Sequence, residues 1–251
     1  MDYLALVYGF LGQYAKAETL CAEAVKAIAA IEGLETERAL VYRSNLAEYL
    51  RNQGKYADAE KLFREVRAAQ DRALAAEHLN RFETLNSLSV QYHLQGRFAE
   101  AEGLARECLL GRRDLARLGP DDYRVGDALS QLVLTLLAQN RFADAEPVAR
   151  ECRRVRELGP PDDWRRAVAL SQLGGCLLGL DRVTDTEPLL TQGYEELKQV
   201  RDRIPAIDRR RLVEAGERLA NALGAVNRPV QSAEIEREVE MWRMWSSPRK
   251  E

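Results

Sequence analysis

The 251-residue sequence lacks the features from which most catalytic, metal and nucleic-acid sites are built. It has only two histidines, His78 and His93, and they fall in different predicted helices. No glycine-rich loop follows a strand, so no phosphate-binding motif is present. The charges almost balance, with a net charge of −3. Nucleic-acid-binding proteins usually carry an excess of basic residues, so this balance argues against nucleic-acid binding. These absences predict no catalytic residue, no metal ligand, no cofactor and no nucleic-acid partner.

Cysteine and long apolar runs are also scarce. The four cysteines, Cys21, Cys108, Cys152 and Cys176, show no CxxC spacing, so neither zinc nor a disulfide framework is expected. We predict small buried thiols, which fit the reducing cytoplasm. No apolar run approaches the ~18 residues needed to span a bilayer, and the N-terminus lacks the features of a signal peptide. The sequence therefore predicts a cytoplasmic protein with no membrane partner.

What the chain does contain is a repeated motif. A turn residue is followed, in most copies, by an aromatic residue two positions later and by Ala-Glu three positions after that. Successive turns are 42, 42, 44, 41 and 46 residues apart, at Gly12, Gly54, Gly96, Asn140, Asp181 and Asn227. A period in this range is typical of stacked helical repeats. Ala, Leu, Glu and Arg dominate the composition, and they favour helices.

We therefore predict an all-α protein, an α-α superhelix (solenoid) of about six helix-turn-helix repeats in a single array. The predicted repeats span approximately 1–33, 34–79, 80–121, 122–163, 164–206 and 207–247, and 248–251 form a disordered polar tail. The first helix is shorter than its counterpart that begins near Thr36 and has no capping residue before it. This predicts that the chain is a fragment or a segment of a longer solenoid.

Two linkers carry helix-ending residues. Residues 118–123 and 158–164 both contain Leu-Gly-Pro followed by paired aspartates. Glycine favours a left-handed helix end, and proline cannot continue the helix. An aspartate can then cap the following helix. Gly119 and Gly159 are thus predicted C-caps.

Small and aromatic residues are predicted to set the packing. Close helix crossing needs a small side chain, which Ala17, Ala59, Ala101 and Ala145 would supply. The aromatic residues two positions after the turns would fill the space between neighbouring hairpins. They are Tyr14, Tyr56, Phe98 and Phe142. The fifth repeat departs from the pattern, because it has Thr186 at the crossing and a helix with Gly174, Gly175 and Gly179. The three glycines predict either close packing or a soft joint.

The motif resembles the tetratricopeptide repeat. The resemblance rests on Leu88, Ser89, Tyr92, Gly96, Phe98 and Ala101 and their copies, and covers nearly the whole chain. The long period and the linkers are similar to the extended 42-residue repeats of kinesin light chains and of bacterial signalling proteins. The resemblance implies a non-catalytic scaffold for protein-protein interaction, which binds a peptide or protein segment in a concave groove lined by the first helix of each pair.

On that geometry, hydroxyl and amide side chains should form a ladder along the groove, where amides can pair with a peptide backbone. The rungs are Ser44, Asn45, Asn86, Ser87, Ser130, Gln131, Ser171 and Gln172. The next turn of the same helices would set specificity, through Glu48, Arg51, Asn52, Val90, His93, Leu94, Leu134, Leu137 and Leu178. We predict a ligand with an apolar segment beside a charged or polar one.

Three alternatives stay open at this point. The ladder residues could instead solvate a helix face or bond between adjacent repeats. The chain could be a regulatory sensor module of a larger signalling protein, for example C-terminal to a kinase or nucleotide-binding domain, with the glycines of repeat five as its soft joint. It could also form a homo-oligomer through the ends of the array, either at the first repeat or at the end that contains Trp242 and Trp245.

Overall fold

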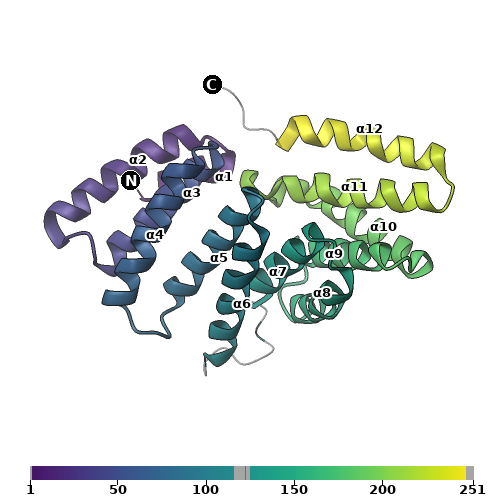
Figure 1. The fold of residues 1–251 in the computed structure, drawn as a ribbon. Helices are drawn as coiled ribbons and strands as arrows, with labels where there is room; N and C mark the ends of the chain where they lie inside the picture. The colour runs from purple at the N-terminus through teal and green to yellow at the C-terminus, as the bar shows by residue number, and fades with distance from the viewer. Residues whose placement is uncertain (1, 116–121, 123–124, 247–251) are drawn as a thin grey trace. The chain divides into compact units, whose positions relative to one another are not determined.

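The computed structural model describes residues 2–115, 122 and 125–246 (Figure 1). Most of the first predicted linker, including Gly119, and the predicted tail 248–251 lie outside the described residues. The described chain contains twelve α-helices, two short 3-10 segments and no strand, which confirms the predicted all-α array of six helical hairpins. The α-helices are α1 (Asp2–Leu11), α2 (Tyr14–Glu32), α3 (Glu37–Asn52), α4 (Tyr56–Ala73), α5 (Leu79–Leu94), α6 (Phe98–Asp114), α7 (Gly126–Ala138), α8 (Phe142–Glu157), α9 (Arg165–Gly179), α10 (Val183–Gln199), α11 (Arg210–Ala225) and α12 (Pro229–Ser246).

The described chain divides into two compact units of three hairpins each. Unit 1 contains α1–α6, up to Leu115, and unit 2 contains α7–α12, from Asp122 onwards. Within each unit, every helix packs on the next one along the chain. All three tryptophans of the sequence lie in unit 2, so tryptophan fluorescence reports on that unit alone.

The six predicted turn residues all adopt the left-handed backbone conformation. Their φ angles are 82°, 77° and 73° at Gly12, Gly54 and Gly96, and 57°, 60° and 57° at Asn140, Asp181 and Asn227. In each turn the next residue donates its N–H to the carbonyl five positions back, at 2.9 or 3.0 Å. This is the Schellman arrangement, which satisfies the last carbonyls of a helix. One turn geometry therefore closes all six hairpins.

The second linker differs from the prediction. Gly159 does not have a positive φ, and α8 ends with an ordinary helical backbone at Leu158. Proline follows Gly159 directly, which disfavours a helical conformation there and ends the helix without a left-handed residue. The predicted aspartate cap is present, since the Asp163 carboxylate accepts a hydrogen bond from the backbone N–H of Arg165 at 3.0 Å.

Small residues fill the helix crossings as predicted. Ala17, Ala59, Ala101 and Ala145 are all fully buried. Thr186 is also buried, and its hydroxyl is paired, because it donates to the Arg182 carbonyl one turn back at 2.8 Å.

The turn aromatics, by contrast, do not share one environment. Tyr14 is buried, Phe98 and Phe142 are half-buried, and Tyr56 is 38% exposed. The wedge in unit 1 is filled instead by Phe63, which is fully buried against Leu88 and other residues of the next hairpin. The spacing of the aromatics identified the turns but not which ring enters the core.

The glycines of the fifth repeat are packing positions. A Cβ on Gly174 would lie 2.6 Å from Leu190, one on Gly175 would lie 2.9 Å from Arg218, and one on Gly179 would lie 2.3 Å from Phe142. Each glycine therefore accommodates a neighbouring side chain. This close packing gives no support to the soft-joint hypothesis.

The last helix is held by a partly buried polar network. Tyr194 of α10 donates to Glu238 at 2.8 Å and accepts from the Trp242 indole at 2.9 Å, while Lys198 pairs with Glu238 at 2.9 Å. Trp242 and Trp245 pack against the core of unit 2. Both tryptophans thus anchor α12 to its own unit.

Candidate peptide-binding face

The first helices of neighbouring hairpins lie against each other within each unit. In unit 1, α3 contacts α5, and in unit 2, α9 contacts both α7 and α11. The predicted site residues therefore form two sets, one on α3 and α5 and one on α7 and α9. The two sets differ in how many of their polar side chains are buried or already form hydrogen bonds within the chain.

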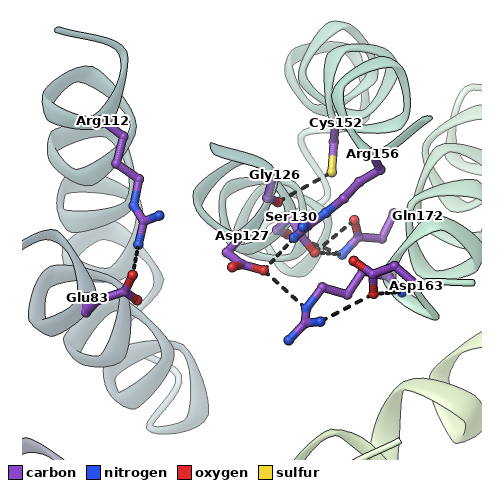
Figure 2. Close-up of polar contacts among 10 residues, drawn as sticks. Glu83, Arg112, Gly126, Asp127, Ser130, Cys152, Arg156, Asp163 and Gln172 are labelled. Carbon is purple, nitrogen blue, oxygen red and sulfur yellow. Dashed lines mark hydrogen bonds and ion pairs between the residues drawn. The ribbon is translucent and has the colours of Figure 1, made fainter. Parts of the chain in front are cut away.

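The set in unit 2 is largely buried. Gln131, Leu134, Ser171 and Gln172 have side chains that are almost wholly buried, although an outward position was predicted for them. The Gln172 amide donates to the hydroxyl and the carbonyl of Ser130 at 2.8 and 3.2 Å (Figure 2). Gln131 bonds within its own helix to Thr135 at 3.4 Å. Ser130 and Gln172 thus join adjacent repeats, as the alternative interpretation of the ladder proposed.

A cluster of charged residues on α11 lies next to this set. Arg218 donates to the Ser171 hydroxyl at 3.1 Å. Burial acts to raise the pKa of Glu214, but Arg211, Arg218 and Arg210 outweigh it and hold that pKa at about 2. The Glu214 carboxylate lies 3.1 Å from Arg211 and 3.6 Å from Arg218. The charged side chains in this part of unit 2 are therefore paired with each other.

The last two predicted residues of this set are apolar. Leu137 and Leu178 are half-buried, and Leu178 packs on the unit 2 core.

In unit 1, four of the predicted residues also make internal contacts. The Ser44 hydroxyl lies 3.4 Å from that of Thr84, and Ser87 donates to Glu48 at 2.7 Å. Arg51 is 4% exposed, contrary to the outward position predicted, and donates to the Ser87 carbonyl at 3.1 Å. These bonds hold α3 and α5 together.

The other unit 1 residues remain partly open. Asn45, Asn52 and Asn86 are half-buried on α3 and α5, as are Val90, His93 and Leu94. The Asn86 side-chain oxygen is buried, and among the described residues nothing donates a hydrogen bond to it. His93 packs edge-on against Phe98, with ring centres 5.4 Å apart. The α3–α5 face, which we define as these six residues, thus combines three amides with an apolar strip.

A regular set of ion pairs at the hairpin junctions was not recognised in the sequence. In four hairpins, the glutamate that follows the crossing residue pairs with the basic residue after the next turn. Such junction pairs are Glu18–Lys55 at 2.8 Å, Glu60–Arg97 at 2.9 Å, Glu146–Arg182 at 2.6 Å and Glu187–Arg228 at 2.5 Å. The recurrence of a basic residue after the turn was the available signal. These ion pairs link neighbouring hairpins to each other.

The junction pairs predict an acid-sensitive stability. Burial acts to raise the pKa of Glu60, but hydrogen bonds from Arg97 and Gln95 lower it below 4.5 overall. A lowered folded pKa stabilises the fold above the unfolded value, and this stabilisation is lost as pH falls through the folded pKa. Glu60→Gln should therefore cost about 1 kcal/mol at pH 7. Urea titrations between about pH 7 and pH 3 should show that the variant and the wild type converge in acid; a constant difference at every pH would contradict this assignment.

The cysteines are structural. All four are free and buried. Cys108 donates to the backbone carbonyl of Phe82 at 3.2 Å. Cys152 donates to the backbone carbonyl of Gly126 at 3.6 Å (Figure 2). Burial raises the pKa of Cys152 to about 12, and it has the same effect on Cys176. Neutral, enclosed thiols of this kind are poor nucleophiles.

The described residues also bear on two other kinds of site. No group of three or more His, Cys, Asp or Glu side chains is arranged to hold a metal ion in this part of the chain. No helix in the described residues combines the length and the apolar character needed to cross a bilayer.

The fold and the α3–α5 face define helical hairpins in which, within each unit, the second helix of one hairpin packs on the first helix of the next. Two family models described as tetratricopeptide repeat match the chain, one over residues 1–68 and 35–114 and the other over residues 125–158. The chain belongs to the tetratricopeptide repeat family, whose members are typically non-catalytic scaffolds for protein interaction. The hairpins beyond residue 158 are identified by the same left-handed turns. No curated protein matches the sequence.

Solved structures show the same fold. BtubC (BKLC) from P. vanneervenii is 15% identical, covers 97% of this chain and 94% of its own, and has a TM-score of 0.67. The nearly identical TPR-like repeats of a putative kinesin light chain from Podospora anserina are 20% identical over 80% of this chain and 94% of theirs, with a TM-score of 0.62. MamA residues 41-end from Desulfovibrio magneticus RS-1 are 14% identical over 82% and 95%, with a TM-score of 0.52. At these identities the likeness concerns the fold alone.

Proposed function

We propose that the chain is a non-catalytic scaffold that binds an extended peptide segment of a partner protein on the α3–α5 face of unit 1. The observation that carries the proposal is the contrast between the two units. In unit 2, the rungs Gln131, Ser171 and Gln172 are buried, Gln172 bonds to Ser130, and Ser171 accepts from Arg218. In unit 1, Asn86 keeps a buried acceptor without a donor among the described residues.

The chemistry of the face suits a peptide backbone. Each asparagine side chain offers both donors and an acceptor, so three of them can bond successive peptide groups without reading their side chains. Val90 and Leu94 supply the apolar contact on α5, and the Glu48–Arg51 pair lies on the adjoining turn of α3. The ligand expected is an extended segment with apolar side chains beside charged or polar ones.

The test is a combined substitution of Asn45, Asn52 and Asn86 by alanine. A linear peptide selected on the wild-type chain from a displayed random library serves as the probe. Each hydrogen bond contributes about 0.5–1.5 kcal/mol, so losing three should weaken peptide binding by at least about tenfold. Isothermal titration calorimetry measures the affinity, and circular dichroism checks that the variant is folded.

A matched control replaces two amides elsewhere, Gln192 and Asn221, which are exposed in unit 2. This control should bind the peptide as tightly as the wild type. Equal binding by the folded triple variant would refute the proposed site, and failure to select any peptide would refute the proposed ligand class.

A further inference from the structure

The first helix has an unusually apolar surface. No charged residue occurs between Tyr3 and Gln13. Six large apolar side chains of α1 are exposed, namely Tyr3, Leu4, Leu6, Val7, Phe10 and Leu11, by between 37% and 82%. Elsewhere in the described chain, the eight exposed apolar side chains of this size are scattered over several helices and loops. A concentration of this kind marks an interaction surface.

The repeat shows which role these residues have. Leu4 and Tyr8 lie eight and four positions before their turn, where α5 has Leu88 and Tyr92. In α5 both residues are buried in a cluster with Phe63 of the preceding hairpin. Later first helices repeat the arrangement with buried leucines at 132 and 136, 173 and 177, and 219 and 223. In α1, by contrast, Leu4 is 46% exposed. The helix therefore presents a stacking face to solvent.

The opposite end of the array does not complement this face. The groove between α11 and α12 is lined by polar residues around a small apolar floor, and these include Glu217, Glu236 and Glu240. Arg243 neutralises part of this charge through bonds to Glu217 and Glu240, at 2.7 and 2.9 Å. Docking α1 there would strip carboxylates of water without pairing all of them. Head-to-tail stacking of copies is thus disfavoured.

We propose that a second copy of this chain covers α1, through antiparallel pairing of the two α1 helices about a two-fold axis. An uncharged apolar face is complemented by an equally uncharged apolar face, and within the described chain α1 itself is the surface that qualifies. Two-fold pairing of like surfaces is the commonest form of self-association. The exposed apolar area of α1 is on the order of 500 Å² per copy, which places the pair near the lower limit for a specific interface.

The pairing can be tested by sedimentation equilibrium of the wild-type chain over about 1–200 µM, a range suited to an interface of this size. We expect a monomer-dimer equilibrium, and a double variant Leu4→Glu/Phe10→Glu should be monomeric over the whole range. A control variant, Val230→Glu/Met244→Glu, changes two exposed apolar residues of α12 and should dimerise like the wild type. Circular dichroism should show all three proteins equally folded, because the substituted side chains are exposed.

A disulfide test reports the geometry independently. Val7 lies near the middle of α1, so Val7→Cys should place two thiols close to the two-fold axis. The native cysteines are buried and leave the introduced thiol as the reactive one. Mild oxidation should give a covalent dimer from Val7→Cys but not from Met241→Cys. A wild type that is monomeric throughout, a dimer that survives the glutamates, or equal cross-linking of the two cysteine variants would each overturn the proposal.

Discussion

Replacing Phe63 by alanine is expected to destabilise unit 1 by about 3–5 kcal/mol, the usual cost of removing a fully buried ring. Phe63 has no exposed surface and lies at the junction of two hairpins, where it meets Leu88 and Tyr92 of the next one. Because repeats are stabilised by contact with their neighbours, a cavity at this junction weakens both hairpins at once.

Tyr56→Ala is the matched control, since it removes an aromatic ring of the same hairpin that is 38% exposed. Its cost should stay below about 1 kcal/mol, as expected for a residue outside the core. Urea unfolding followed by far-UV circular dichroism measures both variants. Tryptophan fluorescence should change little in either, because the tryptophans lie in unit 2. Equal effects of the two substitutions would show that Phe63 is not the principal ring of this junction.

Replacing Gly193 by alanine should destabilise unit 2 by about 2–3 kcal/mol, at the upper end of what overpacking costs. A Cβ at this position would lie 2.8 Å from the Ala167 carbonyl oxygen and 3.0 Å from the Ser171 nitrogen. Both are backbone atoms of α9, so no side chain can move aside, and α10 must shift away from α9. The loss should appear even though alanine favours a helix by about 1 kcal/mol over glycine.

Gly103→Ala provides a control of opposite sign. Gly103 is in α6, and among the described residues no atom outside the nearby backbone of its own helix lies within 4 Å of an added Cβ. Here only the helix propensity acts, and the variant should be more stable by about 0.5–1 kcal/mol. Denaturation followed by tryptophan fluorescence reports the Gly193 variant, and circular dichroism reports the Gly103 variant. A stabilising Gly193→Ala would mean that the two helices are not in close contact.

The sequence predicts the hairpins well because their signals are local. A turn needs a residue that tolerates a positive φ, and glycine, asparagine or aspartate at Gly54, Asn140 or Asp181 meets this need without reference to the rest of the chain. The buried alanines at four of the crossings follow at a fixed distance from their turns. Start and end signals such as Thr36, which caps α3 by accepting from the Ala39 N–H, are local in the same way.

The polar ladder was harder to predict because its residues are neighbours on a helix. Ser171 and Gln172 are adjacent in sequence, and a helical repeat alone does not show which of them faces an adjoining helix. Both side chains are buried. Gln172 donates a hydrogen bond to Ser130 on α7, and the Ser171 hydroxyl accepts one from Arg218 on α11. Only the placement of three helices together distinguishes a rung that joins repeats from one that stays open, such as Asn86.

The connections within hairpins and the connections between hairpins differ in how much their lengths vary. Within every hairpin, the second helix begins two residues after the left-handed position. Between hairpins, the gap ranges from the four residues between Glu32 and Glu37 to the ten that separate Gln199 from Arg210, even within the described residues. Inserted tags or duplicated segments should therefore be tolerated at the variable joints, and the hairpin itself is the unit by which such a protein can lengthen or shorten during evolution.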